Sequence, residues 1–325
     1  MSGPLAGLRV LDLTRVLAGP FATAILADLG ADVVKLEPPT GDDYRAIGPF
    51  RDGESALFAL TNRGKRSVVV DLKAPEGQAL ARRMAAGCDV VVENFRPGVA
   101  ARLGLGAEAL RAENPGLVVC SISGFGQSGP DTALPAYDII VQALSGWMDA
   151  TGEAGGGPLK VGEALGDVAA GLYAAIGILA ALVGRGRTGE GAALDVAMLD
   201  CLVAMLPTSH ALHLYAGQSV ARVGNRHPLS TPFGGYRTAD GHVIIAVLGA
   251  RQFAALCRLM GRPQAADDPR FATDEGRTAH EPEIRALIED WSARLSTDDA
   301  VAALRGADIP AAPILTLAGQ LASAH

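Results

Sequence analysis

One acidic residue, Asp167, stands where a carboxylate could act as a nucleophile. It ends the segment Gly162–Asp167 (GEALGD), directly before an apolar stretch, Val168–Val183, that predicts a helix. A carboxylate at a helix start lies in the positive field of the helix, which would lower its pKa and keep it ionised for attack on a carbonyl carbon. On its own, however, this pattern favours a helix N-cap without chemistry. Glu163 is the second candidate carboxylate.

Other catalytic and metal-binding patterns are missing from the sequence. It contains no Gly-x-Ser-x-Gly nucleophile elbow and no His-Glu-x-x-His zinc motif. His210 and His213 share one helical face without a third ligand, so we interpret them as structural. We expect no metal and no permanently bound cofactor. Without metal-ligand or redox spacing, the cysteines are expected to be buried, reduced thiols: Cys88, Cys120, Cys201 and Cys257.

The first two hundred residues alternate strand and helix patterns, which indicates a parallel sheet covered on both faces. Short, apolar segments predict five strands: Leu8–Leu13, Asp32–Leu36, Ser67–Asp71, Asp89–Val92 and Leu117–Ser121. Helical patterns occur at Pro20–Leu29, Pro75–Ala86, Val168–Val183 and Leu194–Leu206. The third of these helices is apolar all round, so we expect it to be buried on every side.

The later part of the sequence has the pattern of a smaller α+β domain. Gly235–Val247 predicts a hairpin that turns at Asp240-Gly241. Helices are predicted at Gln252–Met260, Ile284–Leu295 and Thr297–Leu304, with Ser296 capping the last. We therefore expect a large Rossmann-like α/β domain (1–212), a linker (213–233), a small α+β domain (234–312) and the start of a return segment (313–325).

Composition and the first turn limit the ligands. A formal net charge of -7 argues against a broad nucleic-acid surface. The turn Thr14–Pro20 has one glycine where a dinucleotide fingerprint needs three, although Glu37 ends the second strand where a ribose-binding acid would lie.

Met1–Leu13 carries charges inside its apolar run, unlike a signal peptide, and Val168–Val183 is short for a membrane span. We expect a cytoplasmic protein that binds neither nucleic acid nor membrane.

Several segments together resemble the class III CoA-transferase family of the CaiB–BaiF type. They follow in order over essentially the whole chain: Gly7–Leu13, Ala18–Pro20, Leu29–Glu37, Asn62–Ser67, Val92–Gly98, Ser123–Gly126, Gly166-Asp167 and Gly189–Asp200. The resemblance implies a Rossmann-like domain, a small α+β domain and a homodimer of interlocked chains. It also implies that coenzyme A passes from an acyl-CoA donor to a carboxylic acid acceptor, with Asp167 as the nucleophile and coenzyme A as a substrate.

The resemblance further implies which residues contact CoA or line its channel. They are Val16, Ala18, Leu72, Lys73, Asn94, Phe95, Arg102, Tyr137 and Met198. The sequence departs from some family members at Pro38-Pro39, where they carry a basic residue that meets the nucleotide. It also stops at His325, whereas relatives usually continue well past Ile309–Pro313, so we expect a truncated chain.

The family also contains α-methylacyl-CoA racemases, which need two bases beside the α-carbon. Tyr137 occupies the position where such enzymes typically carry a histidine. A tyrosine with an ordinary pKa near 10 is a poor base at neutral pH, so this position favours a transferase. A CoA-binding protein without turnover is the third alternative.

The expected mechanism passes through an aspartyl–acyl anhydride and an aspartyl-CoA thioester on Asp167. Anhydrides hydrolyse easily, so water must be excluded. Gly152–Gly157 and the segment near Gly234-Gly235 are candidates for a cover over the site, and backbone N–H groups near Gly166 could stabilise the oxyanion. The acceptor acid could be recognised by three neighbouring residues, Asn225, Arg226 and His227.

Overall fold

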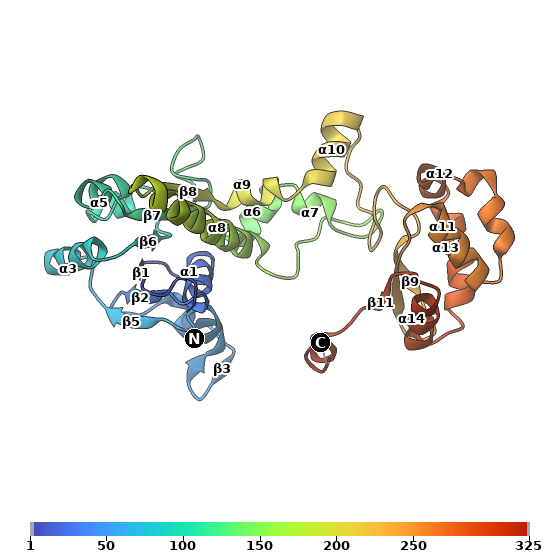
Figure 1. Ribbon diagram of the computed structural model, residues 1–325, viewed down its shortest axis with the longest axis horizontal. Helices are drawn as coiled ribbons and strands as arrows, with labels where there is room; N and C mark the ends of the chain where they lie inside the picture. Colours follow the sequence, from blue (N-terminus) through green and yellow to red (C-terminus); the bar gives the residue numbers. More distant parts are fainter. Residues whose placement is uncertain (1–2, 324–325) are drawn as a thin grey trace. The chain divides into compact units, whose positions relative to one another are not determined.

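The computed structural model describes residues 3–323, which form two compact units. Within these residues, unit 1 comprises 3–150 and 158–220, and unit 2 comprises 151–157 and 221–323 (Figure 1). Residues 1–2 and 324–325, at the ends of the predicted large domain and return segment, lie outside the described residues.

Unit 1 is built on a six-stranded parallel sheet. Its strands are β1 (Arg9–Asp12), β2 (Asp32–Glu37), β5 (Arg66–Val69), β6 (Val90–Glu93), β7 (Val118–Ser123) and β8 (Ala193–Ala197). They lie in the order β5-β2-β1-β6-β7-β8. This is the strand order of the Rossmann fold, in which the direction of winding reverses between the first strand and its neighbour. The parallel α/β prediction and all five predicted strands are confirmed.

The sixth strand corrects one prediction, because Leu194–Leu206 was expected to be a single helix. Ala193–Ala197 instead pairs with β7 as β8, and the helix α9 (Met198–Ala204) begins only after it. A short apolar run such as ALDVA fits a strand and a buried helix equally well by periodicity. The segment becomes a strand because it pairs with β7, a contact between distant parts of the chain that local periodicity does not contain.

Two layers of helices cover the sheet (Figure 1). One face packs against α1 (Ala18–Asp28), α8 (Leu165–Thr188) and α9 through side chains such as Val10, Val33 and Cys120. The other face, which includes Leu11 and Val91, packs against α3 (Pro75–Ala86) and α5 (Ala107–Glu113). Successive strand residues thus serve opposite cores, as a sheet buried on both sides requires.

The remaining elements of unit 1 are short and lie in the connections. They are η1 (Asp43–Ala46), β3 (Phe50–Arg51), β4 (Glu54–Ser55), α2 (Ala56–Thr61), α4 (Val99–Arg102), α6 (Asp138–Leu144), α7 (Trp147–Ala150) and α10 (Pro207–Ala216). The last helix continues past residue 213, where the sequence pattern placed the start of the linker.

Helix α8 is longer than predicted and only partly buried, so the expectation of burial on every side was wrong. Its inner side, with Ala170, Ala174 and Ile178, packs into the core shared with α1. Its outer side exposes four large side chains: Leu172, Tyr173, Ile176 and Val183. By length and composition alone α8 would pass as a membrane span. Its inner side nevertheless packs as the central helix of unit 1.

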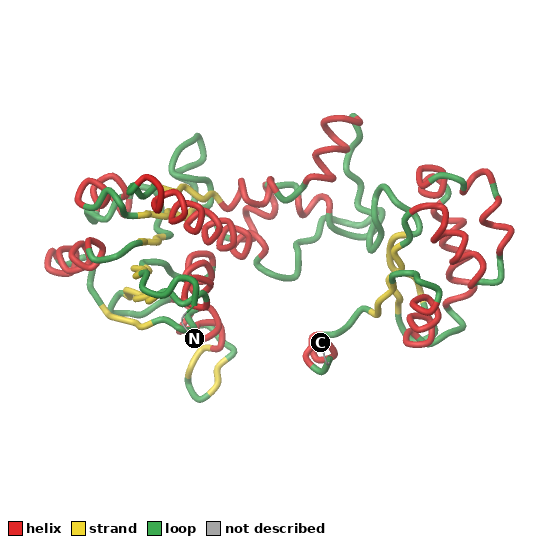
Figure 2. The backbone as a smooth tube through the Cα atoms, in the orientation of Figure 1, coloured by secondary structure: helices red, strands yellow, loops and turns green. Residues whose placement is uncertain are grey.

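Unit 2 contains an antiparallel sheet with helices packed against it (Figure 2). Its strands, in the order β11-β10-β9, are β9 (Phe233–Arg237), β10 (His242–Ala246) and β11 (Ala311–Pro313). The helices are α11 (Gly249–Leu259), η2 (Pro263–Asp267), η3 (Pro269–Phe271), α12 (Asp274–Ala279), α13 (Glu281–Ser292), α14 (Thr297–Gly306) and α15 (Leu317–Leu321). The predicted hairpin is confirmed. Ser296 also caps α14, because its hydroxyl accepts a 3.1 Å hydrogen bond from the Asp299 amide.

Candidate functional site

The residues predicted to contact CoA all follow the carboxyl ends of strands in unit 1. We call the side of the sheet at which these strands end its carboxyl edge. Val16 and Ala18 follow β1, and Asn94 and Phe95 follow β6. The others follow β5, β6, β7 and β8: Leu72, Lys73, Arg102, Tyr137 and Met198. In open parallel sheets ligands bind beyond this edge, where the winding reverses, which here is between β1 and β6.

Two of the predicted segments are in direct contact at this reversal. The Asn94 side chain accepts a 2.8 Å hydrogen bond from the Arg15 amide and donates one of 2.8 Å to the Arg15 carbonyl. The loop after β6 is thereby joined to the turn between β1 and α1, which carries Val16. Asn94 therefore has a structural role whether or not it also contacts a ligand.

The other predicted residues differ in exposure. Ala18 and Met198 are buried, Leu72 and Phe95 pack partly into the core under α3 and α5, and Tyr137 is 74% exposed. The cations Lys73 and Arg102 are exposed, as groups that meet phosphates in solvent would be.

The turn between β1 and α1 has an unusual backbone conformation. Val16 adopts φ +69°, a left-handed conformation that is rare for β-branched residues and costs energy. Its amide donates a 3.2 Å hydrogen bond to Asp42 Oδ1. Such strain persists only where surrounding contacts hold it, and it gathers at functional sites.

Asp167 lies in the first turn of α8, but it does not cap the helix. The N-cap position belongs to Ala164, two residues before Gly166, and no side chain of the cap residue bonds there. Instead Asp138, at the start of α6, accepts a 2.7 Å hydrogen bond from the Gly166 amide. The capping alternative for Asp167 is therefore wrong, and its carboxylate is left for another role.

A second residue of α6 fixes the chain that leads into α8. The buried Gln142 side chain accepts a 2.9 Å hydrogen bond from the Val161 amide and donates one of 3.1 Å to the Glu163 carbonyl. It also donates a 2.8 Å bond to Asp138. The segment before Asp167 is thus held by two residues of α6, whereas Glu163 itself is exposed.

The pKa of Asp167 is raised to about 7, contrary to the expectation that the helix end would lower it. Burial of the carboxyl group is the largest cause, and the nearby charge of Asp138 adds to it. The nearby Ala18 backbone amide acts in the opposite direction and lowers this pKa. Desolvation and like charge therefore outweigh the effect of the Ala18 amide, and the pKa of Asp167 lies near neutrality.

Close packing of α1 against α8 brings Ala18 to Asp167. A Cβ atom on Gly171, one turn after Asp167, would come within 2.8 Å of the Ala18 carbonyl oxygen. A glycine is therefore required there for the two helix starts to approach each other. The carboxylate thus lies at the N-terminus of α1 as well as within the first turn of α8.

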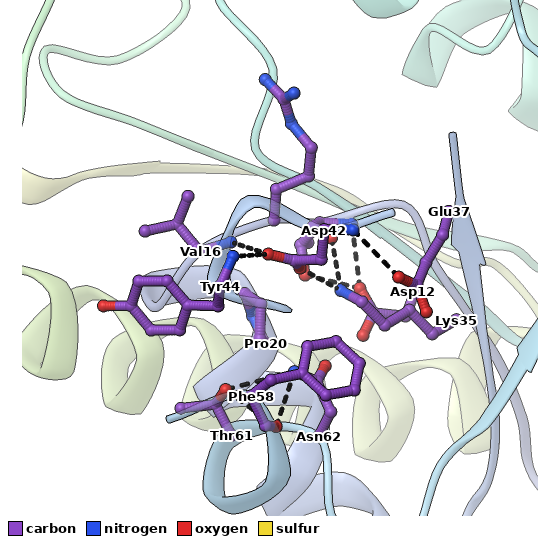
Figure 3. Close-up of polar contacts among 12 residues, drawn as sticks. Asp12, Val16, Pro20, Lys35, Glu37, Asp42, Tyr44, Phe58, Thr61 and Asn62 are labelled. Atoms are coloured by element: carbon purple, nitrogen blue, oxygen red, sulfur yellow. Dashed lines mark hydrogen bonds and ion pairs between the residues drawn. The ribbon is translucent and has the colours of Figure 1, made fainter. Parts of the chain in front are cut away.

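A group of buried charges lies under the carboxyl edge (Figure 3). Lys35 pairs with Asp42 at 2.8 Å, and Lys65 pairs with Asp12 at 2.9 Å; all four side chains are at most 2% exposed. Burial alone would raise the pKa of Asp12, but Lys65 and Lys35 outweigh it and hold that pKa at about 2. The Asp12 carboxylate is therefore ionised at neutral pH although it is buried.

Glu37, which the dinucleotide interpretation placed at a ribose, is fully engaged within the protein. It accepts two 2.7 Å bonds from Arg45 and one of 2.5 Å from Ser67. Burial would raise its pKa, but Arg45 and the other donors lower it to about 2. The carboxylate thus holds the loop after β2 and is not free for a sugar.

Tyr44 belongs to the same region, although no sequence pattern singled it out. Its amide donates a 2.9 Å hydrogen bond to Asp42 Oδ1, and its ring lies near Val16 (Figure 3). Burial raises the pKa of its phenol first, and the charge of Asp167 raises it next. The ring therefore lies within the electrostatic reach of the candidate nucleophile.

Asp138, Gln142, Asp42 and Tyr44 are the residues that sequence reasoning missed. For Asp138 there was a signal, because an acid that directly precedes an apolar helical run can cap or receive a neighbouring amide. Asp42 follows a Pro-Pro-Thr-Gly turn, which predicts a turn but not its partner.

In unit 2, Asn225 and Arg226 line a cavity of about 510 Å³ together with Arg285 and three glutamates. His227 does not line it; its amide donates a 2.7 Å bond to the Phe233 carbonyl. Because Arg285 is paired with Glu281 at 2.7 Å, the cavity has no excess of free positive charge to attract an acid.

The described residues also address the metal and thiol expectations. Among residues 3–323, no three His, Cys, Asp or Glu side chains are placed to hold a metal ion. The cysteines are free thiols, three of them buried, and burial raises the pKa of Cys120 to about 12.

Comparisons with known proteins agree with this fold. The chain matches the model of CoA-transferase family III over residues 5–325. It is 46% identical to a succinate–glutarate CoA-transferase of Agrobacterium fabrum, with 96% of this chain and 80% of the relative covered. It is 43% identical to an acetyl-CoA:oxalate CoA-transferase of Acetobacter aceti, with 97% and 82% covered.

A solved structure is similar over the whole chain. A CaiB/BaiF family protein from Brucella suis is 42% identical and superimposes with a TM-score of 0.88, covering 100% of this chain and 87% of that chain. The chain therefore belongs to CoA-transferase family III and is a CoA-transferase.

Proposed function

We propose that Asp167 is the nucleophile through which this CoA-transferase moves coenzyme A from an acyl-CoA donor to a carboxylic acid. The observation that carries the proposal is its half-buried carboxylate, with a pKa near neutrality, at the N-terminus of α1 and the carboxyl edge of the sheet. It does not serve as a cap, and the chain before it is fixed by Asp138 and Gln142.

The proposed reaction has four substitutions. An Asp167 oxygen attacks the thioester carbonyl and CoA leaves as a thiolate, which gives an aspartyl–acyl anhydride. The thiolate attacks the Asp167 carbonyl carbon and releases the donor acid, leaving an aspartyl-CoA thioester. The acceptor carboxylate attacks this carbon and expels the thiolate, giving a second anhydride. The thiolate then attacks the acceptor carbonyl, so product acyl-CoA forms and the Asp167 carboxylate returns without net proton transfer.

The raised pKa of Asp167 has a consequence for this scheme. Only the ionised carboxylate attacks, so the fraction of active enzyme rises as pH passes about 7. The burial that raises the pKa also leaves the carboxylate poorly solvated, and a poorly solvated carboxylate is a stronger nucleophile. The Ala18 amide and the helix starts keep part of the population ionised at neutral pH.

The predicted contact residues support a CoA site at the carboxyl edge. Exposed Lys73 and Arg102 suit the CoA phosphates, and the strained turn at Val16 and the loop at Asn94 and Phe95 lie where the winding reverses. Met198 and Tyr137 follow β8 and β7 along the same edge. CoA enters this scheme as a substrate, without a permanent cofactor.

We further propose a short dicarboxylic acid as the acceptor. Relatives that match this chain over 96–97% of its length are named for succinate, glutarate, oxalate and mesaconate. A second carboxylate gives the acceptor a charge that remains free while the first reacts.

A homodimer and a cytoplasmic location complete the proposal. The outer side of α8 exposes Leu172, Tyr173, Ile176 and Val183. Contiguous apolar surface of this kind marks an interface, and an interlocked second copy would cover it. Sedimentation of the protein as a dimer, and as a monomer after Ile176→Lys, would support this assignment; a monomeric parent protein contradicts it.

The test of the nucleophile uses succinyl-CoA without an acceptor, followed by mass spectrometry of the Asp167 peptide. We expect a covalent CoA adduct on Asp167 and a loss of transfer activity of at least about a thousandfold in Asp167→Asn. Glu163→Gln, which removes the exposed neighbouring carboxylate, is the matched control and keeps both. Full activity in Asp167→Asn overturns the proposal.

A further inference from the structure

Asp42 connects three separate parts of the carboxyl edge. Its Oδ1 atom accepts hydrogen bonds from the Val16 amide at 3.2 Å and the Tyr44 amide at 2.9 Å. Its Oδ2 atom pairs with Lys35 at 2.8 Å. One carboxylate thus joins the β1–α1 turn, the η1 segment and strand β2 (Figure 3).

Lys35 completes the arrangement from the side of the sheet. Its ammonium group donates a 2.7 Å hydrogen bond to the Thr14 carbonyl, in the same turn that Asp42 holds through Val16. The turn is therefore held at one carbonyl by the cation and at one amide by the anion. The side chains of Lys35 and Asp42 are 1% and 0% exposed.

Val16 lies two residues before Ala18, the first residue of α1. Val16 is held in its left-handed conformation directly before α1 begins at Ala18. The start of α1 lies close to α8, because a Cβ on Gly171 would come within 2.8 Å of the Ala18 carbonyl oxygen, and the Ala18 amide lowers the pKa of Asp167. A turn that relaxed at Val16 would rotate the first amide of α1 away from that carboxylate.

We propose that the buried Lys35–Asp42 pair is a positioning device for the reaction, which holds Val16 and Tyr44 so that the start of α1 meets the Asp167 carboxylate. Asp42 and Lys35 are positioning residues, because they act through this turn and not on the substrate. The inference rests on the proposed role of Asp167 as the nucleophile.

The energetics favour a role of this kind. Burying two charges costs several kcal/mol per ion, and a buried ion pair is often no more stabilising than apolar residues of similar volume. An apolar pair could fill this space, but it could not accept hydrogen bonds from two amides at one point. The observed geometry therefore needs an acceptor at position 42.

The experiment compares two double variants that both remove the buried charges. Lys35→Met with Asp42→Asn keeps an oxygen that can accept from Val16 and Tyr44. Lys35→Met with Asp42→Ala removes that oxygen. Because neither variant leaves an unpaired buried ion, both should fold, and thermal unfolding with circular dichroism verifies this. Each is measured for kcat, KM and the pH dependence of adduct formation on Asp167.

We expect kcat of the alanine double variant to be about ten- to a hundredfold below that of the asparagine double variant. We also expect the acid limb of its pH profile at higher pH, since the Ala18 amide opposes the raised pKa of Asp167. The other groups that act on Asp167 and Tyr44, namely Asp138 and Glu163, are unchanged in both variants. Equal kcat and equal pH profiles in two folded variants overturn the inference.

A matched control lies at the opposite edge of the same sheet. Asp89 accepts a 2.8 Å hydrogen bond from the Arg9 amide and pairs with Arg185 at 3.1 Å, so it too combines an amide and a cation. Asp89→Ala should lower stability and leave the pH profile unchanged. Asp167→Asn separates the two proposals: if it is active, the nucleophile assignment fails, whereas if it is inactive and the double variants are alike, only the positioning role fails.

Discussion

The two edges of the six-stranded sheet use the same charged residue types in different surroundings. At the carboxyl edge, Lys35–Asp42 and Lys65–Asp12 are almost completely buried. At the amino edge, where the strands begin, Arg66 pairs with Asp32 while their side chains are 69% and 47% exposed. Two fully buried ion pairs therefore lie where the candidate site is, whereas the Arg66–Asp32 pair at the other edge is solvated.

This difference separates two uses of an ion pair. Exposed pairs contribute little to stability, because water and salt screen them. Burying an ion pair costs desolvation free energy, and removing only one of its two charges strongly destabilises the protein. At the carboxyl edge they hold the turn and loops around Asp167, whereas at the amino edge they stabilise strand ends at most slightly. Three substitutions test this distinction.

The largest effect is expected for Lys65→Met, which leaves the buried Asp12 side chain without its nearest cation. We expect the free energy of unfolding to fall by about 3–5 kcal/mol, measured by urea denaturation at pH 7. Adding Asp12→Asn should restore most of this loss, since no unpaired charge then remains. A single variant as stable as the parent protein would show that the pair is not tightly coupled.

For Asp167→Asn we expect the free energy of unfolding to rise, by less than it falls in Lys65→Met. Because the pKa of Asp167 is about 7 in the folded protein and near 3.8 when unfolded, the folded state holds the proton more tightly, so its ionisation destabilises the fold as pH rises from 4 through 7. Asn should therefore stabilise the protein by about 1–3 kcal/mol at pH 8 and not at all below pH 4. Thermal unfolding across this pH range checks it, and an equal gain at every pH contradicts the ionisation argument.

The smallest effect is expected for Asp32→Asn at the amino edge. Asp32 and Arg66 are both about half exposed or more, so we expect the free energy of unfolding to fall by less than about 1 kcal/mol. This fall should be smaller still at high salt. A loss as large as that of Lys65→Met would remove the distinction between the two edges.

Much of the fold follows from local patterns. The five predicted strands have apolar residues that occur in short runs between helices, and a sheet buried on both faces has to read this way. The hairpin at Asp240-Gly241 and the cap at Ser296 depend on neighbouring residues alone and were also predictable. Strand β8 was missed, because its pairing depends on the free edge of β7 from a distant part of the chain.

The candidate site was predictable only in part. Asp167 and the loop residues Val16 and Asn94 came from motifs, and the motifs resemble those of a family to which the chain belongs. The environment of Asp167 could not be predicted from the sequence, because its raised pKa depends on burial and on Asp138, which lies in another helix. Likewise, the sequence could not distinguish the exposed side of α8 from its buried side, because the stretch Val168–Val183 carries no charged residue.

By itself, the sequence determined that a carboxylate would stand at the start of a long apolar helix, since residue order and helix propensity are local properties. Only the tertiary structure decided the surroundings of that carboxylate, and through them its pKa. The approach of α1 across Gly171, the capping of α8 by Asp138 and the turn held by Lys35 and Asp42 join residues that are far apart in the chain. These contacts set the desolvation and the hydrogen bonds of Asp167, and these in turn set its pKa and its readiness to react.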